Sequence, residues 1–351
     1  MLPPIEKVLV IRFSSVGDIL LSSLLLRVFR KRFPGCRIDY LVKADYAELV
    51  RHNPHVSNVI EFPSGGTFGA LNETRRRITE TRYDLLLDIH DSVRSRYLCW
   101  GQRRILRIDK RKMARFALVR TKLDLYRFFG GAPSVAERYL EPLQHLGVKN
   151  DGEGLEVHLP EEAKQKAHAM LENPGGAAHD PVIGMAPSAL HANKMWPAEN
   201  FAEAAIALWH NRHARFILFG SSRDRERCNT IEMMIKDRES TAVVINTAGE
   251  TTLMEAAALM DYCALVVTND SGLMHLATAR KRKVVAIFGP TVREFGFFPY
   301  APDATVVEHS NLACRPCTHI GLSHCPKGHF RCMNEIAPAD VTLAARRLLE
   351  N

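Results

Sequence analysis

The 351-residue sequence lacks the features of a membrane-spanning or exported protein. Its longest apolar stretch, residues 19–29, is interrupted by two serines and an arginine and is shorter than the ~20 residues that a bilayer-spanning helix needs. We expect no signal peptide, because the strand-like segment 7–12 begins almost at once, and no internal repeat or low-complexity tract occurs. We therefore expect a soluble cytoplasmic protein, held at most at a membrane surface.

Two common phosphate-binding fingerprints are also missing. The sequence contains neither the G-x-G-x-x-G pattern of dinucleotide-binding folds nor the G-x-x-x-x-G-K-[ST] pattern of P-loop enzymes. Its composition, 46% hydrophobic and 25% charged, is ordinary for a globular protein and excludes collagen-like, disordered and coiled-coil chains. The length suggests roughly two domains at ~150 residues each.

Positive charge is concentrated in one segment. Residues 94–127 contain 12 Lys and Arg against two acids, whereas the rest of the chain sums to −2 within a net charge of +8. Such a basic segment favours an anionic partner, namely phospholipid head groups, a phosphorylated glycan or nucleic acid. Apolar and basic residues interleave there, which suits either a helix on an anionic membrane or a solvated helix with one apolar side. These residues are Met113, Phe116, Leu123 and Phe128 among Lys112, Arg115, Arg120, Lys122 and Arg127.

Short β-rich segments alternate with helical patterns along both halves of the chain. This alternation predicts parallel sheets built from βαβ units, with ligands at the carboxyl ends of the strands. The predicted strands are 8–12, 37–42, 58–62, 84–89, 182–186, 215–219, 242–246, 264–268 and 283–288. The predicted helices are 18–31, 44–51, 68–80, 92–100, 198–209, 224–236, 252–260, 273–280 and 338–350, with a mostly helical middle at 114–147. A Pro- and Gly-rich linker is expected at 172–180, between domains 1–175 and 176–351.

The first predicted strand leads into a polar turn containing Ser14, Ser15, Gly17 and Asp18. Small and polar residues at such a junction leave backbone N–H groups free to meet an anion or a sugar hydroxyl. Asp18 lies in the first turn of the following helix, where a carboxylate stabilises the helix dipole by ~0.3–1 kcal/mol. Spacing alone favours this capping role over that of a catalytic base.

Similar turns follow four strands of the second half. One contains Asp270, Ser271, Gly272 and, one helical turn later, His275, and could cradle a diphosphate; its alternative interpretation is an aspartate cap with a partly buried histidine. The other turns contribute Ser188 and Lys194, then Ser222 and Asp224 for ribose hydroxyls, and finally Thr291. The convergence of these turns indicates a binding site at one edge of the sheet.

The segments 14–18 (Ser-Ser-Val-Gly-Asp), 194–197 (Lys-Met-Trp-Pro), 270–275 (Asp-Ser-Gly-Leu-Met-His) and 288–291 (Phe-Gly-Pro-Thr) occur in the order typical of glycosyltransferase family 9. The chain thus resembles the ADP-heptose:lipopolysaccharide heptosyltransferases. This resemblance implies an α/β GT-B fold of two Rossmann-like doubly wound domains facing across a cleft. The amino-terminal domain would bind the acceptor and the carboxyl-terminal domain the nucleotide sugar. It also implies inverting, metal-independent transfer of heptose from ADP-heptose to the inner core of lipopolysaccharide.

The resemblance also assigns roles to single residues. Asp18 matches the general base, and the donor contacts would be Ser188, Lys194, Ser222, Asp224, Asp270, Ser271, Gly272, His275 and Thr291. Where some members carry Glu, this chain has Ser222, and Asp224 is the substitute for the ribose contact. Acceptor contacts are expected at Ser14, Ser15 and Gly17, with Arg94 and Arg96 added because they follow a strand end. No cofactor is expected for catalysis.

Two other functions fit parts of this pattern. A branch of the same family transfers heptose to autotransporter proteins, and a non-catalytic RNA-binding protein could also use the basic segment. Few aromatic residues interleave with its arginines, so nucleic acid is not an expected partner. The expected partners are ADP-heptose, a lipopolysaccharide-core acceptor and the anionic inner-membrane surface.

The eight cysteines fall into two groups. Cys36, Cys99, Cys228 and Cys263 lie in or beside predicted strands and helices and are interpreted as core residues. Cys314, Cys317, Cys325 and Cys332 crowd the tail, where a cytosolic setting favours a structural Zn²⁺ or, second, an iron site. The short gaps between them leave unmetallated thiols or disulfides as the alternative.

Overall fold

The computed structural model describes residues 5–172 and 180–350, which form two compact units. Unit 1 consists of the chain up to Lys112 together with Pro133–His158, and unit 2 of Met113–Ala132 together with the chain from Leu159 onward. The chain enters unit 2 for the last time at Leu159, before the expected domain boundary at residue 175. The reason is that helix α8 (Glu161–Leu171) packs on α11 (Leu253–Met260) of unit 2. Most of the expected linker, residues 173–179, lies outside the described residues.

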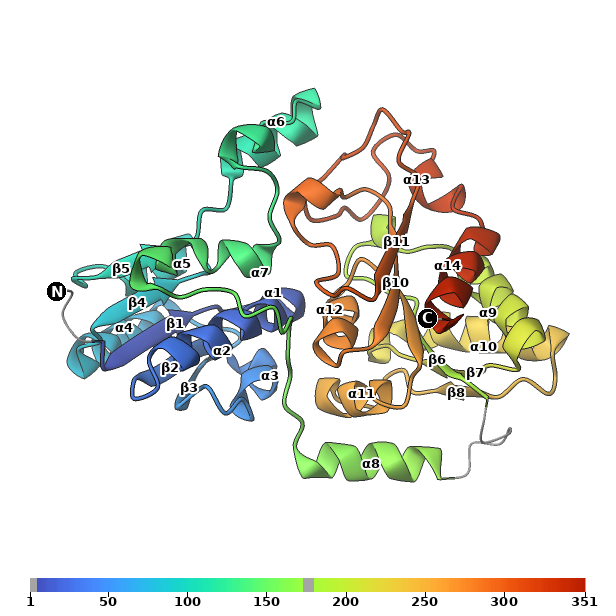
Figure 1. Cartoon of the computed structure of the whole chain (residues 1–351), viewed down its shortest axis with the longest axis horizontal. Helices are drawn as coiled ribbons and strands as arrows, with labels where there is room; N and C mark the ends of the chain where they lie inside the picture. Colours follow the sequence, from blue (N-terminus) through green and yellow to red (C-terminus); the bar gives the residue numbers. More distant parts are fainter. Residues whose placement is uncertain (1–4, 173–179, 351) are drawn as a thin grey trace. The chain divides into compact units, whose positions relative to one another are not determined.

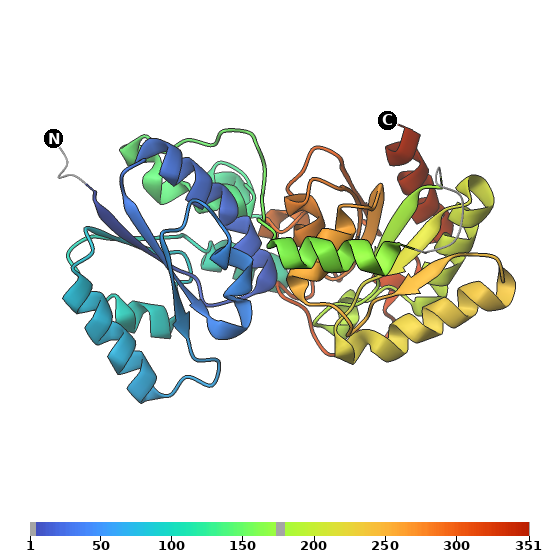
Figure 2. The ribbon, with the colours of Figure 1, turned by 90° about the horizontal axis from the view of Figure 1, so that it is seen from below.

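Unit 1 contains a five-stranded, fully parallel sheet in the order β3-β2-β1-β4-β5. Its strands are β1 (Lys7–Ile11), β2 (Arg37–Lys43), β3 (Asn58–Phe62), β4 (Leu85–Asp88) and β5 (Ile105–Arg107). Its α-helices are α1 (Val16–Leu21), α2 (Ser23–Arg32), α3 (Glu48–Arg51), α4 (Phe68–Thr81), α5 (Val93–Leu98) and α7 (Val135–Arg138). Helices α2 and α4 lie on opposite faces of the sheet (Figure 2), so unit 1 is doubly wound.

Unit 2 contains a six-stranded parallel sheet in the order β11-β10-β9-β6-β7-β8. Its strands are β6 (Val182–Ala186), β7 (Arg215–Leu218), β8 (Val244–Asn246), β9 (Leu265–Asn269), β10 (Lys283–Phe288) and β11 (Ala304–Glu308). Besides α8 and α11 it contains α6 (Lys112–Thr121, whose first residue ends unit 1), α9 (Ala198–Arg212), α10 (Arg225–Arg238), α12 (Gly272–Ala279), α13 (Arg331–Asn334) and α14 (Pro338–Glu350) (Figure 1).

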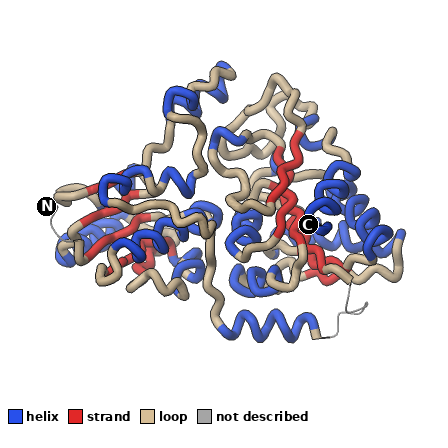
Figure 3. The backbone as a smooth tube through the Cα atoms, viewed as in Figure 1, coloured by secondary structure: helices blue, strands red, loops and turns tan. Residues whose placement is uncertain are grey.

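Both sheets are the cores of their units, as Figure 3 shows. The central strands are made mostly of apolar, often β-branched residues that are buried on both faces, as parallel strands between two helix layers must be, whereas the edge strands are only partly buried. Burial of each large apolar side chain contributes ~1.5–3 kcal/mol, so these cores dominate the stability of the units. Within residues 5–172 and 180–350, no helix combines the length and apolar character needed to cross a bilayer.

The chain winds in one direction from β1 to β3 and then returns to place β4 on the other side of β1. In unit 2 it winds from β6 to β8 and then places β9 beside β6. Ligands of doubly wound folds bind where the winding direction changes, beyond the carboxyl ends of the two strands that start the opposite windings. The topology therefore predicts one site after β1 and β4, and another after β6 and β9.

The expected elements differ in detail from the structure. The single helix expected at 18–31 is divided at Ser22, whose buried hydroxyl donates to the carbonyl of Ile19 at 2.7 Å and contacts the Tyr40 hydroxyl at 2.8 Å. A serine that bonds to the preceding turn competes with regular helix geometry. Strands β5 and β11 and helix α8 were not expected from the sequence at all.

Candidate active site

Asp18 lies in unit 1 where the first strand turns into a helix. Ser15 precedes α1 as its cap residue, and both its backbone N–H (3.3 Å) and its hydroxyl (2.9 Å) donate to Asp18 Oδ2. Arg12, the last polar residue before the turn, contacts the same oxygen with Nη2 at 2.6 Å. The capping role expected for Asp18 is therefore confirmed, and a buried guanidinium is added to it.

These contacts decide the ionisation of Asp18. Burial opposes the charged form, but the adjacent guanidinium of Arg12 and the hydrogen bonds from Ser15 outweigh it and lower the pKa of Asp18. All three polar contacts reach Oδ2, and among the described residues none is made to Oδ1. The site thus holds an ionised carboxylate with one oxygen able to accept a proton from a bound ligand.

Sequence reasoning missed two neighbours of this carboxylate. Arg12 is fixed by donating Nη1 to the carbonyl of Ile89 at 2.8 Å and Nε to that of Ser14 at 2.7 Å. His90, after β4, is edge-on to Phe13, and burial together with the charge of Arg12 lowers its pKa to about 3. The signal for Arg12 was present in the sequence, because a lone arginine at the end of an apolar strand is rarely buried without a partner.

The residues expected to contact an acceptor are only partly gathered. Ser14 and Gly17 belong to the same turn as Asp18, and Gly17 is buried in α1. Arg94 and Arg96 are exposed on α5, where Arg96 donates to Asp91 at 2.7 Å. Lys112 contacts the other oxygen of Asp91 at 3.1 Å, so part of the basic charge is compensated inside unit 1.

In unit 2, side chains from three strand ends meet at Asp270, which follows β9. Lys194, in the loop after β6, places Nζ 2.6 Å from Asp270 Oδ2. Thr291, after β10, donates its hydroxyl to the same oxygen at 2.7 Å. The convergence expected for Lys194, Asp270 and Thr291 is therefore confirmed, and it occurs at the switch between β6 and β9.

The capping interpretation of Asp270 is wrong. The cap residue of α12 is Ser271, and Asp270 points instead toward Lys194 and Thr291. Neighbouring groups hold this arrangement: Asn269 accepts from the Trp196 backbone at 3.0 Å and donates to the Pro187 carbonyl at 2.7 Å. Arg315, missed by sequence reasoning, donates to the Thr291 carbonyl at 2.8 Å.

Polar groups suited to an anion lie beside this cluster. The Ser188 hydroxyl is buried and, in the part of the chain that the structure describes, has no hydrogen-bond partner. A buried polar group without a partner costs ~1–3 kcal/mol, which a bound ligand can relieve. Ser271 and Gly272 begin α12, whose first N–H groups point out of the helix, whereas His275 is buried in it. Sequence reasoning also missed His191. Burial lowers the pKa of this histidine, and the nearby charge of Lys194 lowers it further.

Ser222 and Asp224 follow β7. Asp224 accepts from the Ser221 backbone at 2.8 Å and the Ser221 hydroxyl at 2.7 Å, so it is a cap of the short helical turn before α10. Gly249 has φ +73°, and a Cβ there would lie 2.8 Å from Ser222 Cα. Glycine is thus required for the close approach of the two loops. No contact joins Asp224 to the Asp270 cluster among the described residues.

The basic segment is divided between the units after Lys112. In unit 2, Ala114 and Leu118 of α6 pack with Tyr126 against Phe295. The interleaved apolar residues are exposed: Met113 76%, Phe116 65%, Leu123 49% and Phe128 71%. They are therefore not the buried side of an ordinary solvated helix. Several exposed large apolar side chains within one short segment are typical of interaction surfaces.

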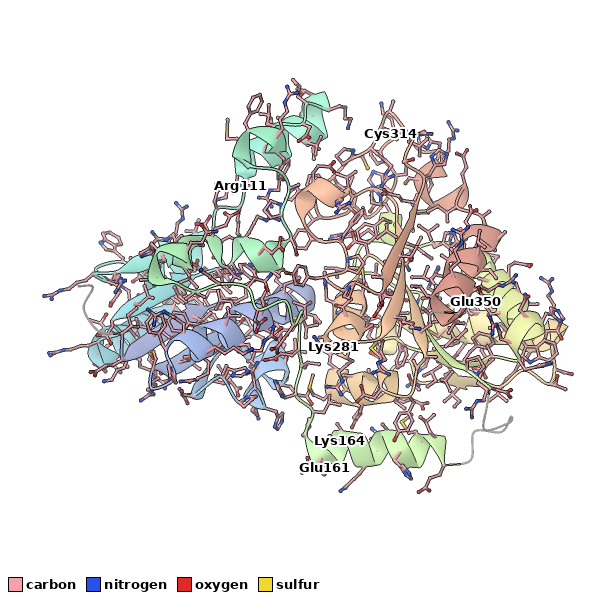
Figure 4. The ribbon with its side chains drawn as sticks, viewed as in Figure 1. Arg111, Glu161, Lys164, Lys281, Cys314 and Glu350 are labelled. Atoms are coloured by element: carbon pink, nitrogen blue, oxygen red, sulfur yellow. The ribbon has the colours of Figure 1, made fainter. Side chains whose placement is uncertain are left out.

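The first group of cysteines lies in the core, as expected. Cys36, Cys99, Cys228 and Cys263 are buried core residues. Three tail thiols lie in the loops that follow β11, where Figure 4 labels Cys314, and Cys332 lies in α13. Lys122 donates to the carbonyls of Cys314 and Pro316. Cys314 Sγ is 3.7 Å from His329 Nε2, and burial raises the pKa of Cys332 to about 12. Among the described residues, no three potential ligands of the tail lie within 4.8 Å of one another.

Comparison with known proteins identifies relatives over most of the chain. The family model for glycosyltransferase family 9 (heptosyltransferase) matches residues 72–326. Lipopolysaccharide heptosyltransferase 2 of Salmonella typhimurium is 32% identical over 297 residues, covering 82% of this chain and 84% of that protein.

Solved structures agree with this match. The ADP-heptose lipopolysaccharide heptosyltransferase II of E. coli has a TM-score of 0.72 and 27% identity, with 98% of each chain covered. A family 9 glycosyltransferase of Veillonella parvula has a TM-score of 0.80 at 24% identity, covering 98% of this chain and 97% of that one. These likenesses confirm the expected GT-B fold class.

Proposed function

The chain belongs to glycosyltransferase family 9, the heptosyltransferases, and we propose that it transfers heptose from ADP-heptose to the inner core of lipopolysaccharide. The names of its relatives in Salmonella and E. coli support this donor and acceptor. The observation that carries the proposal is the meeting of Lys194, Thr291 and Asp270 at the switch point of unit 2, beside the unpartnered hydroxyl of Ser188.

Unit 2 would bind the donor. The ammonium group of Lys194 is mostly buried and fixed by its ion pair with Asp270. It is therefore already positioned to contact the diphosphate, and the side chain need not rearrange when the donor binds. The first amides of α12, at Ser271 and Gly272, and the Ser188 hydroxyl supply further donors for phosphate oxygens. The buried His275 would support this turn, and Ser222 and Asp224 would lie toward the ribose.

Unit 1 would supply the base. An acceptor hydroxyl attacks the anomeric carbon of heptose, the new C–O bond forms, and the bond to the diphosphate oxygen breaks with inversion. Asp18 Oδ1 takes the hydroxyl proton while Arg12 and Ser15 hold Oδ2. General-base catalysis of this kind contributes about 10²–10⁴ in rate. The negative charge leaves with ADP and is stabilised by Lys194 and the α12 amides, so no metal ion is required for the transfer.

The acceptor is a phosphorylated, membrane-borne glycolipid, and the exposed surface around α6 fits such a partner. We define the α6 surface as Met113, Phe116, Leu123 and Phe128 with Arg120 and Arg127. Its apolar side chains would enter the lipid boundary while its arginines contact phosphates. Arg94, on α5 of unit 1, adds an exposed charge for the core phosphates.

We also propose that Cys314, Cys317, Cys325 and Cys332 hold a structural Zn²⁺ or iron ion. Their thiols fall within electrostatic reach of one another, since Cys314 and Cys325 both raise the pKa of Cys317 in addition to burial. Thiolates suit either ion, which would cross-link the tail loops. Elemental analysis of the purified protein should find one equivalent of metal that a Cys314→Ser, Cys317→Ser variant lacks, and a metal-free tail in which all four cysteines alkylate would overturn this assignment.

The experiment for the main proposal is a transfer assay with ADP-heptose and lipopolysaccharide acceptors of graded core length. We expect a mass increase of one heptose on inner-core acceptors, and ADP binding in isothermal titration. Failure to bind ADP would overturn the transferase assignment. ADP binding with transfer to an autotransporter protein, and none to glycolipid, would move the chain to the protein-modifying branch of the family.

A further inference from the structure

A compact cluster of two imidazoles and a carboxylate lies in unit 1, apart from the residues assigned to catalysis. His55 lies in the loop between α3 and β3, and Glu156 and His158 lie in the extended segment that ends unit 1. Along this segment Leu155 and Val157 are buried, so Glu156 and His158 point to the opposite side together. We call these three residues the His55 cluster.

The spacing of the cluster matches a metal polyhedron. His55 Nε2 is 3.2 Å and His158 Nε2 is 3.4 Å from the same carboxylate oxygen, Glu156 Oε1, and all three ligand atoms lie within 4.8 Å of one another. In a tetrahedral site with Zn–N and Zn–O bonds of ~2.0–2.1 Å, two ligand atoms are separated by ~3.3–3.4 Å. The two separations from Glu156 Oε1 therefore fit three ligands around one ion.

Groups behind the cluster orient its ligands. Arg27 donates Nη1 to Glu156 Oε2 at 2.9 Å, which turns Oε1 toward the imidazoles, and the Glu156 backbone donates to the Ser23 hydroxyl at 3.0 Å. The His55 backbone is fixed on both sides, because its N–H donates to Asn53 and its carbonyl accepts from Arg30 at 3.0 Å. Outer contacts that fix first-shell ligands are a regular feature of protein metal sites.

Carboxylates balance the positive charge of the arginine behind the cluster. Arg27 Nη2 lies 2.8 Å from Asp151 Oδ1, and Arg27 Nη1 lies 2.9 Å from Glu156 Oε2. Glu153 Oε2 lies 3.7 Å from Nε of the same arginine.

We propose that His55, Glu156 and His158 bind a divalent transition-metal ion such as Zn²⁺, with water as the fourth ligand. Two imidazoles and one carboxylate suit zinc and its neighbours, whereas Mg²⁺ and Ca²⁺ require more oxygen ligands. The ion joins the loop after α3 to the segment by which the chain leaves unit 1. Its role is therefore to fix the end of unit 1, independently of the proposed transfer reaction.

The test is Zn²⁺ titration of the full chain by calorimetry, with Co²⁺ absorption as the probe of ligand type. His55→Ala and His158→Ala should each lose one equivalent of bound Zn²⁺, or at least about tenfold in affinity for it, relative to the wild type. The lost Co²⁺ signal should carry no thiolate charge-transfer band, which separates this site from the cysteine tail. Zn²⁺ should also raise the Tm of the wild type more than that of the variants.

Two further variants make the result decisive. His168→Ala removes an exposed imidazole that pairs with the single carboxylate Glu172 on α8, and it should bind Zn²⁺ as the wild type does. Glu156→Gln keeps a group that can accept from Arg27 but removes the charged ligand, so it should lose the same equivalent even if a histidine variant fails to fold. Unchanged stoichiometry and affinity in all cluster variants would show that the three residues form only a hydrogen-bonded ion pair.

Discussion

Asp18 in unit 1 and Asp270 in unit 2 both lie beyond a strand at the switch point of their sheet, but Asp18 follows the first strand of its unit and Asp270 the fourth, and their surroundings are assembled differently. Each carboxylate receives a cation and a hydroxyl on Oδ2, at 2.6–2.9 Å. The partners of Asp18, Arg12 and Ser15, come from one turn of the chain. Those of Asp270 come from two other strand ends. A carboxylate with a cation and a hydroxyl can therefore be assembled from neighbours in the sequence, as at Asp18, or from separate strands that the sheet brings together, as at Asp270.

The difference also concerns which member of the set faces a ligand. At Asp18 the cation is buried behind the carboxylate, held by the Ile89 carbonyl, and Oδ1 has no partner among the described residues. At Asp270 the carboxylate is buried and the cation is Lys194, which is more exposed than the carboxylate that it contacts. The first arrangement presents a proton acceptor and the second a positive charge.

Replacement of the proton acceptor should have the largest effect. Asp18→Asn should lower kcat about 10²–10⁴-fold with ADP affinity unchanged, measured by steady-state kinetics and calorimetry. Glu255→Gln is the matched control, because Glu255 accepts from the Thr252 backbone in a similar capping box on α11. It should lose stability but keep turnover. Full activity of Asp18→Asn would restrict Asp18 to capping.

Removal of the unit 2 cation should rank second. Lys194→Gln should lower kcat about 10²–10³-fold, the usual cost of losing one group that stabilises developing negative charge, and should weaken ADP binding as well. Lys166 on α8 is paired with Glu255 on α11, so Lys166→Gln is the matched control. It should change neither kcat nor ADP binding. An effect of Lys194→Gln confined to the KM of the acceptor would contradict the assignment.

Removal of the buried arginine should change pH dependence more than maximal rate. The pKa of Asp18 is lowered in the native protein. Its carboxylate therefore becomes protonated, and stops acting as a base, only at a pH below 3.8, the ordinary pKa of an aspartate. Arg12→Gln should raise this pKa by ~1–3 units and move the acid limb of the kcat/KM profile to higher pH by the same amount. An unmoved acid limb, in a variant shown to be folded by its thermal transition, would contradict the arrangement.

The two hydroxyls should give the smallest effects and separate the two sites. A single hydrogen bond contributes ~0.5–1.5 kcal/mol, or about 2- to 10-fold in an equilibrium or rate. Thr291→Val should weaken ADP binding without moving the acid limb of the kcat/KM profile. Ser15→Ala should move that limb slightly to higher pH without changing ADP affinity. If both variants changed the same parameter, the division of roles between the units would be wrong.

The sequence predicted the parts of the fold that have strong apolar periodicity. Both sheets and the strand ends carrying Asp18, Lys194 and Asp270 were placed correctly, because buried parallel strands are continuous apolar segments followed by polar turns. Strand β5, three residues among arginines, and helix α8, which buries only Ala163 and Ala167, gave no comparable signal.

The contacts of the sites were harder to predict than their positions. The pairing of Lys194 with Asp270 depends on β9 lying next to β6, and no local pattern contains that strand order. The two Asp interpretations show the same limit: a cap was the favoured interpretation at Asp18 and the alternative one at Asp270, and only Asp18 caps its helix. What a carboxylate does is decided by the charges that the tertiary fold brings to it.

The path of the chain restricts how this protein can be recombined with its relatives. It passes between the units after Lys112, Ala132 and His158, and the excursion 113–132 completes a small apolar cluster around Phe295. A hybrid spliced once near the middle would combine Leu118 and Tyr126 from one parent with Phe295 from another. Chimeras meant to exchange donor specificity should therefore carry residues 113–132 along with the carboxyl-terminal half.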